Sequence, residues 1–333
     1  MKRLMLAAAG LATLSALAAT PAHATFPGKN GRIVFQRPVG QQSDLFTVKP
    51  NGQGIRRLTR TRLFEDRAEW SADGRALTFA GSNMSGSREE IWTIAADGGQ
   101  RRALTSFRSI SAAPTWSPDG RIAYFTLSDF PPPASEDDPP APAEIHSLAA
   151  DGTDDQRLTN DTDIQTDPTW SPDGSTIAYI HWCRVAGEEG SFDLTLYAMN
   201  RDGTGQRPLL PCSAKRFISN ANWSPDGRQL VFEVATEHPR GRGEDGQSDI
   251  AVINADGTGL RRLTRTRALE THPVWSPDGR RIAFTSDRHA RRGPFELLGP
   301  AFELYTMRAD GRGIKRITHN KVPDLHPSWQ AIG

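Results

Sequence analysis

The chain is poor in cysteine and in aromatic residues. Only two of its 333 residues are cysteines, Cys183 and Cys212, and Phe, Trp and Tyr together make up 8%. So few cysteines exclude a disulfide-dense scaffold and the clustered Cys spacing of structural zinc sites. After residue 24 no segment is long and apolar enough to cross a bilayer as a helix. We therefore expect no membrane span.

Sequence motifs of catalysis are also missing. The chain contains no Gly-x-Ser-x-Gly elbow, no His-Glu-x-x-His pair and no glycine-rich phosphate loop. We therefore expect no catalytic residues, no cofactor and no metal site.

Charge of either sign is not in excess. The sequence has 40 Lys and Arg against 39 Asp and Glu, which leaves no electrostatic footprint for nucleic acid. Two nearly identical arginine-rich segments occur, at residues 56–62 and 261–267, and acidic residues follow each of them at once. We interpret these segments as a record of internal duplication rather than as a nucleic-acid patch.

The N-terminus has the pattern of a secretory signal peptide. Two basic residues, Lys2 and Arg3, precede an Ala-rich apolar stretch, and a small-x-small cleavage pattern ends at Ala24. A transmembrane anchor is the alternative, but the stretch is short and a cleavage site follows it. We predict a signal peptide over residues 1–24, one domain over residues 25–333, and a secreted or periplasmic monomer.

One unit repeats along the predicted domain. Its best-preserved part is Trp-Ser-Pro-Asp-Gly, and the tryptophans follow one another at intervals of 46 to 54 residues. The unit occurs at residues 116–120, 170–174, 223–227 and 275–279, with a variant at 70–74 and a last tryptophan at position 329. A feature that every repeat carries serves the repeat itself, with Trp buried between sheets and Asp capping its own turn.

Each repeat predicts four short strands. Alternating apolar residues follow the Pro-Asp-Gly turn, and two further runs are separated by a second Asp-Gly turn, as in residues 281–285, 303–307 and 315–318. Proline stands two residues before Trp in most repeats, which places that strand at the inner edge, and arginine beside the last run suits an exposed outer edge. The first repeat lacks a Trp strand, and residues 326–329 supply one at the C-terminus. The sequence thus predicts an all-β, six-bladed propeller closed by the C-terminal strand in blade one.

These elements resemble the PD40 repeats of the TolB-like, WD40-like propeller family. The resemblance rests on Trp-Ser-Pro-Asp-Gly, Ile-Ala-Phe, Leu-Tyr-x-Met and Arg-Leu-Thr, and it covers nearly all of residues 26–330. It implies a propeller fold but leaves function open, because the same repeat serves binding scaffolds, gating domains and some secreted lyases.

A candidate binding site follows from one repeat position. Three residues before Trp, the repeats differ from each other and are mostly polar, which packing alone would not require. We predict that these residues ring the channel mouth, on the face that carries the long variable loops (128–144, 184–192, 236–248 and 287–302). An anionic or carbonyl group would meet the basic members, and the others would offer acceptors opposite. The predicted binding residues are Arg67, Asp167, Asn220, His272 and His326, with Ala113 at the sixth position. Hydration of an empty channel is the alternative.

Two functions remain open from the sequence. The first is an exported, non-catalytic binding module with a protein, peptide or glycan ligand on the loop face. The second is a metal-assisted polysaccharide lyase that uses His and Asp at the channel mouth, and such an enzyme would need a transition metal.

The two cysteines are predicted to pair. Cys183 and Cys212 both follow strand ends on the loop face, and an exported protein meets an oxidising compartment. Two separate thiols are the alternative, because the second and fourth strands of a blade are not neighbours.

Overall fold

The computed structural model describes residues 25–83, 88–106, 110–127, 142–160, 163–184, 192–212, 216–236, 247–289 and 302–333. The predicted signal peptide and most residues of the four long loops lie outside these ranges. Every regular element in the described ranges is a β-strand, as the repeat pattern predicted. None of the described residues forms a helix that could span a bilayer.

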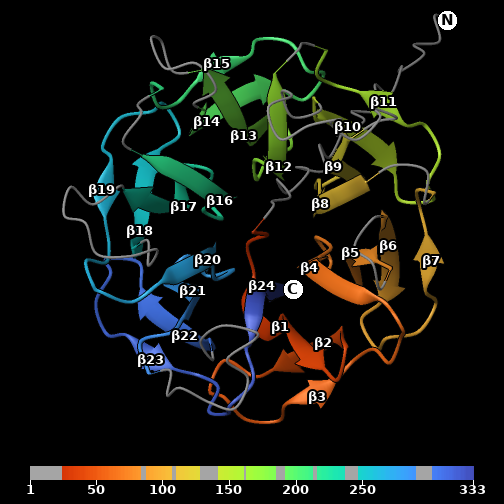
Figure 1. The fold of residues 1–333 in the computed structure, drawn as a ribbon, viewed down its shortest axis with the longest axis vertical. Helices are drawn as coiled ribbons and strands as arrows, with labels where there is room; N and C mark the ends of the chain where they lie inside the picture. The colour runs from red at the N-terminus through yellow and green to blue at the C-terminus, as the bar shows by residue number, and fades with distance from the viewer. Residues whose placement is uncertain are drawn as a thin grey trace, which may run out of the picture.

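The strands form four-stranded antiparallel groups, here called blades, which are arranged around a central channel (Figure 1). The strand nearest the channel is the inner strand of each blade. The inner strands are β4 (Phe64–Trp70), β8 (Ile110–Trp116), β12 (Ile164–Trp170), β16 (Phe217–Trp223), β20 (Glu270–Trp275) and β24 (Leu325–Ile332).

The other three strands of each blade follow outward in chain order. The second strands are β5 (Ala76–Ser82), β9 (Arg121–Leu127), β13 (Thr176–Arg184), β17 (Gln229–Thr236), β21 (Arg281–Ser286) and β1 (Lys29–Val39). The third strands are β6 (Glu89–Ala95), β10 (Glu144–Ala149), β14 (Phe192–Asn200), β18 (Gln247–Asn254), β22 (Glu303–Arg308) and β2 (Gln42–Val48). The outer strands are β7 (Arg102–Ala103), β11 (Gln156–Arg157), β15 (Arg207–Pro208), β19 (Arg261–Arg262), β23 (Lys315–Arg316) and β3 (Arg56–Arg57).

The last strand of the chain pairs with the first. β24 lies antiparallel to β1, with Trp329 opposite Ile33, and β24 also contacts the inner strands β4 and β20. Single parallel bridges, such as that from Ser43 in β2 to Phe64 in β4, join the first blades into one 12-stranded sheet.

The repeated motif builds the turn after each inner strand. In the second copy, the Ser117 hydroxyl donates to Asp119 Oδ1 at 2.6 Å and accepts from the Arg121 amide at 2.7 Å. Gly120 between them has a φ of 87°, which an L-residue rarely adopts. The same Ser–Asp bond recurs in the other copies of the motif. The invariant polar residues of the motif therefore hold a turn, and no ligand is needed to explain them.

The repeated tryptophans pack between neighbouring blades. Trp170 is only 1% exposed and shares an apolar cluster with Ala123 and Ile145 of the preceding blade. Burying an aromatic side chain of this size stabilises the contact by about 2–3 kcal/mol. Repetition of this contact makes the scaffold rigid enough to hold side chains in fixed positions at the channel.

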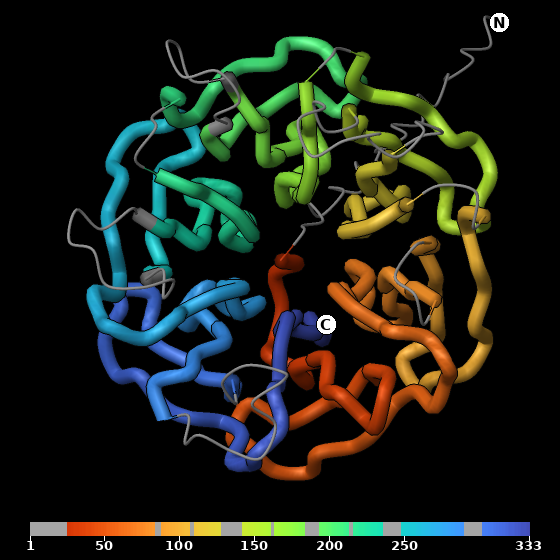
Figure 2. The backbone as a smooth tube through the Cα atoms, in the orientation of Figure 1, coloured from red at the N-terminus to blue at the C-terminus, as the bar shows by residue number. Residues whose placement is uncertain are grey.

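The first described residues lie at the turn side of the channel, and the tube in Figure 2 begins in the middle of the ring. The Thr25 hydroxyl donates to Asn222 Oδ1 at 2.8 Å, and the Gly28 amide donates to the Pro277 carbonyl at 3.3 Å. Thr25 and Phe26 are both buried. This segment therefore lies over the turn side of the channel.

Candidate functional site

Each inner strand contains a β-bulge at the same place. The register of β4 against β5 shifts between Asp66 and Glu69, and equivalent shifts occur in the other inner strands. The bulged residue adopts a left-handed backbone, with φ between 49° and 51°, although none of these residues is glycine. The bulged residues are Arg67, Ala113, Asp167, Asn220, His272 and His326.

These six residues line a single cavity of about 120 Å³ in the channel. The prolines that follow four of them, Pro114, Pro168, Pro273 and Pro327, line the same cavity. Proline removes a backbone donor, so the inner edge leaves fewer N–H groups unpaired. The sequence-predicted set is thus brought together at one place in the fold, while its binding role remains a hypothesis.

Arg67 and Asp167 are in direct contact across the channel. The guanidinium of Arg67 forms an ion pair with the Asp167 carboxylate and lies 3.8 Å from that of Asp66. The small side chain of Ala113, on the strand between them, leaves room for this contact. The negative charge of Asp167 raises the pKa of Arg67 further above its ordinary value. Asp167 is therefore the partner of Arg67 rather than a separate acceptor on the opposite wall.

His272 and His326 meet edge to face on adjacent inner strands. Their ring centroids are 3.6 Å apart. Nδ1 of His326 faces both the Asp66 carboxylate and Gln36 Oε1, the latter at 2.9 Å. Burial, together with the nearby charges of His326 and Arg67, holds the pKa of His272 well below its ordinary value. His272 is therefore a neutral imidazole at physiological pH.

Sequence reasoning missed the carboxylates beside these residues. Burial raises the pKa of Glu69 to about 8, against a hydrogen bond of 3.2 Å from Thr115. Burial and the charge of Asp66 raise the pKa of Glu89 to about 7. Burial also raises the pKa of Glu233, which accepts a 2.9 Å bond from Asn220. The residue directly before Trp varies from repeat to repeat, as the bulged residue does, and this variation could have identified Glu69. Glu89 and Glu233 lie on other strands, where no comparable sequence signal marks them.

The channel therefore holds a compact network of paired charges and of carboxyl groups whose pKa burial raises. A ligand group can enter it by exchanging one of the existing partners, for example by competing with Asp167 for Arg67. Among the described residues, no group of three His, Cys, Asp or Glu side chains is placed to hold a metal ion.

Cys183 and Cys212 lie outside the channel, in the β12–β15 blade. Their sulfur atoms are bonded in the structure, and their Cα atoms are 6.4 Å apart. The bond ties the end of β13 to the segment after the outer strand β15 and thus joins two strands that are not neighbours in the sheet.

A family model, the TolB beta propeller domain (PD40), matches residues 85–238 and 143–295. A TolB homolog from Chlorobium luteolum is 30% identical over 154 residues, which are 46% of this chain and 31% of that protein. The Tol-Pal system protein TolB of Anaeromyxobacter dehalogenans is 32% identical over 134 residues, 40% of this chain and 26% of the relative. The matched segments thus span about a third or less of these relatives.

Solved structures share the fold. TolB from Acinetobacter baumannii superposes with a TM-score of 0.68 at 20% identity, over 90% of this chain and 67% of that one. Hydrazine synthase of Kuenenia stuttgartiensis gives 0.73 at 16% identity, over 93% of this chain and 48% of that one. An oligogalacturonate lyase in complex with manganese superposes with a TM-score of 0.53 at 14% identity, over 88% of this chain and 85% of that one. At these identities the likeness concerns the fold alone. With the family model covering most of the span from residue 85 to residue 295, the chain belongs to the TolB β-propeller family.

Proposed function

We propose that this protein is an exported, non-catalytic binding module that holds a protein, peptide or glycan ligand on the loop face, at the mouth of the channel. The observation that carries the proposal is the set of six bulged residues that line one cavity and differ from blade to blade. A left-handed bulge, which recurs here in each inner strand, costs free energy at a non-glycine residue. A bulge that is kept in every inner strand, with a different side chain each time, supports a role in presenting these side chains to a ligand.

The proposal includes the ring itself. We take the domain to comprise residues 25–333 and to be a six-bladed propeller, closed by β24 as the inner strand of the β1–β3 blade. Pairing of β24 with β1 and its contacts with β4 and β20 support this arrangement. Cleavage after Ala24 would release a monomer to the periplasm or the medium. N-terminal sequencing of the exported protein would then begin at Thr25, whereas Met1 on a membrane-held protein would contradict export.

The names of the relatives favour a protein ligand. One of them is named a Tol-Pal system protein, and a protein that belongs to a system of proteins suggests protein contacts. Because the match covers only 26% of that relative, its partners are not carried over to this chain.

A metal-assisted lyase is the second candidate. It is favoured by the two imidazoles that meet at the channel mouth and by the likeness in fold to a manganese-bound oligogalacturonate lyase. Elemental analysis of the purified protein separates the two candidates. A transition metal bound in stoichiometric amount, and lost on replacement of His272, would favour the lyase.

The binding proposal is tested by capture and substitution. Bait protein is incubated with native envelope and culture fluid, and the captured ligand is titrated against wild type and a His272→Ala/His326→Ala variant. We expect at least a tenfold loss of affinity with little loss of stability, because both side chains face the cavity. Affinity and unfolding that both stay within error would place the ligand elsewhere.

A further inference from the structure

A second surface surrounds part of the loop face, where three successive connections lead from an outer strand to the next inner strand. Each connection exposes two basic or potentially basic side chains. They are Arg265 and Arg267 before β20, His319 and Lys321 before β24, and Arg60 and Arg62 before β4, and we call them together the basic arc. The strands that they precede are neighbours, because β24 contacts both β20 and β4.

The backbone of each connection is clamped at the residue between its two basic side chains. The amides of Thr61 and Thr266 each donate at 3.2 Å to a buried aspartate of the third strand, Asp44 and Asp249 respectively. The amide of Asn320 donates in the same way to Glu303 at 2.5 Å.

A second buried acid, on the following inner strand or directly before it, holds the side chain of the same residue. Thr61 donates to Glu65 at 2.8 Å and Thr266 donates to Glu270 at 3.1 Å. Asn320 donates to Asp324 at 2.8 Å. The clamped residues point inward, so the residues on either side of each project into solvent from a fixed backbone.

The acids that follow the arginines in sequence do not neutralise them. Glu65, Glu270 and Asp324 are each 0% exposed. Glu270 pairs with Arg288, and Asp324 pairs with Arg37 at 2.6 Å. The acids that follow the arginines in sequence are therefore not their ion-pair partners. The expectation that these segments form no nucleic-acid patch stays a prediction. Among the residues that the structure describes, none of the four arginines of the arc has an ion-pair partner.

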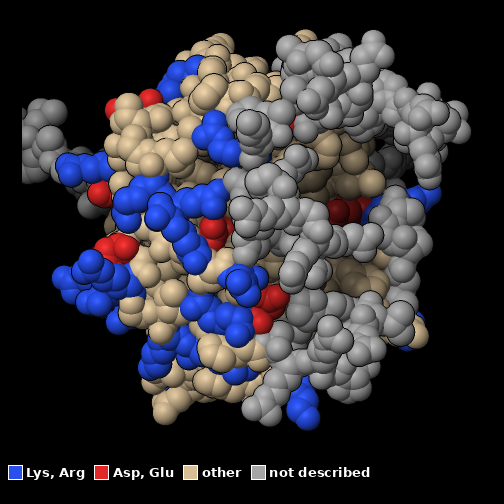
Figure 3. Space-filling view, turned by 60° about the vertical axis from the view of Figure 1, so that its left-hand side comes forward, with Lys and Arg blue, Asp and Glu red and all other residues tan. Residues whose placement is uncertain are grey.

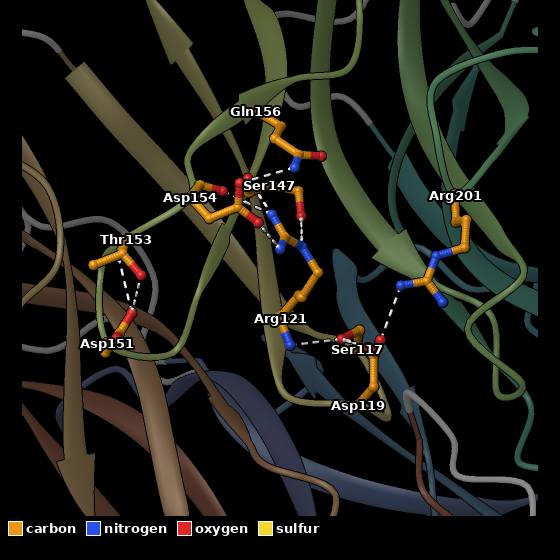
Figure 4. Close-up of polar contacts among 9 residues, drawn as sticks. All are labelled: Ser117, Asp119, Arg121, Ser147, Asp151, Thr153, Asp154, Gln156 and Arg201. Atoms are coloured by element: carbon orange, nitrogen blue, oxygen red, sulfur yellow. Dashed lines mark hydrogen bonds and ion pairs between the residues drawn. The ribbon is translucent and has the colours of Figure 1, made fainter.

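The opposite side of the ring shows the contrast. There, Asp119 and Asp154 are exposed but paired, with Arg201 at 2.9 Å and with Arg121 at 2.7 Å (Figure 4). On the side around β19, basic side chains cover more of the described surface than acidic ones do (Figure 3). A net charge near zero thus accompanies basic side chains of the loop face that have no ion-pair partner among the described residues.

We infer that the basic arc binds an anionic polysaccharide, which deepens the binding function proposed above and rests on it. Guanidinium groups match carboxylate and sulfate oxygens in a forked geometry, and side chains held on a fixed backbone lose less entropy on binding. Recurrence of the pair at successive blades suits a polymer with repeated charges, because each further contact is made at high effective concentration.

The composition of the arc argues against two other partners. The large apolar side chains exposed in the described residues are Ile55, Leu260 and Ile332, and none belongs to the arc. A folded protein partner would need a buried apolar centre, and a membrane surface would need apolar side chains to insert.

The test compares dextran sulfate with uncharged dextran of the same length, since the two polymers differ only in charge. Arg60, Arg62, Arg265 and Arg267 are replaced by Gln in one variant. A matched control replaces four exposed arginines of the turn face, Arg75, Arg228, Arg280 and Arg312, so that the change in net charge is the same.

We expect dextran sulfate to bind wild type, with an affinity that falls steeply as salt rises from about 50 to about 200 mM. The arc variant should bind at least about tenfold more weakly and with a smaller salt dependence, and the control variant should bind like wild type. Uncharged dextran should not bind.

Three outcomes would overturn the inference. An equal loss of affinity for dextran sulfate in the arc variant and the control variant would mean that the polymer is attracted by net charge alone. Tighter binding to vesicles of phosphatidylglycerol and phosphatidylcholine than to the polymer would identify a membrane surface instead. If the arc variant bound dextran sulfate like wild type and His272→Ala/His326→Ala did not bind it, the anion would bind in the channel. The proposed function would then stand, and the inference about the basic arc would be wrong.

Discussion

Arg67 of β4 and Asp167 of β12 form an ion pair across the channel, although 100 residues separate them in sequence. Their side chains are 34% and 18% exposed, so the pair is neither fully buried nor fully solvated. It ties two blades that are not neighbours and sets the charge that a ligand meets at the channel.

Replacement of Asp167 by Asn should lower the free energy of unfolding by about 1–2 kcal/mol, between the values typical of exposed and buried pairs. In an Arg67→Met background the same replacement should have little effect, because the partner is already gone. Urea unfolding of the four proteins gives the coupling energy. Equal effects in both backgrounds would show that the pair does not stabilise the ring.

Glu69 should make stability depend on pH. Its folded pKa of about 8 lies above its ordinary value of 4.5. Between these values the folded protein holds a proton that the unfolded chain has released, so this group's contribution is complete below 4.5 and is lost as the pH rises to about 8. Glu69→Gln should remove that loss, and the difference in melting temperature between variant and wild type should grow in favour of the variant across this window. His272, with its lowered pKa, acts in the opposite direction but is common to both proteins. A constant difference would contradict the assignment.

Deletion of residues 326–333 should abolish cooperative unfolding if β24 closes the ring, because β1 would lose its partner and leave an exposed edge. Trp329→Ala is the milder change. Its side chain is 3% exposed, and its loss should cost about 3–5 kcal/mol. Removal of the exposed Gly333 alone is the control. Thermal unfolding of the deletion that matched wild type would refute closure.

The disulfide should stabilise the β12–β15 blade. Replacement of both Cys183 and Cys212 by Ser should lower stability by about 2–4 kcal/mol. Alkylation without reductant should leave the mass of the wild-type protein unchanged, and alkylation after reduction should add two labels. Addition of two labels without reductant would show that the two cysteines are free thiols and would contradict the disulfide.

The bulge predicts opposite effects of glycine at two adjacent alanines. Ala113 has a φ of 49° and is 8% exposed, while its neighbour Ala112, 5% exposed, has no left-handed backbone. Ala113→Gly relieves strain and should be neutral or stabilising by up to about 1 kcal/mol. Ala112→Gly should destabilise by about 1 kcal/mol, since glycine adds freedom to the unfolded chain. Equal destabilisation by the two changes would argue against strain at the bulge.

Much of the blade could be predicted from sequence, because its signals are local. Proline before Trp and arginine beside the last run placed the inner and outer strands correctly, and the Asp-Gly turns fixed the hairpins. The position three residues before Trp pointed to the channel because a variable polar residue in an otherwise constant unit has no packing role. Closure by β24 stays a prediction.

The contacts within the channel could not be read in the same way. Whether Arg67 reaches Asp167 depends on the size of Ala113 between them and on the diameter of the ring, which no single repeat encodes. The surroundings of the arginine-rich segments could not be read from sequence for a similar reason. Residues near each other in sequence can differ in exposure. Arg62 is exposed and Glu65 is buried, because the strand that follows the connection turns inward.

The left-handed bulge has a consequence for how such proteins diversify. A substitution at this position changes what the channel displays and leaves the Trp-centred packing in place, at a conformational cost that is smallest for Gly, Asn and Asp. Because Arg67 pairs with Asp167 and His272 packs against His326, changes at these four positions are coupled in pairs. Families built on this scaffold should therefore vary at the bulge, with paired changes where bulged residues are in contact, and should change slowly at the tryptophan three residues later.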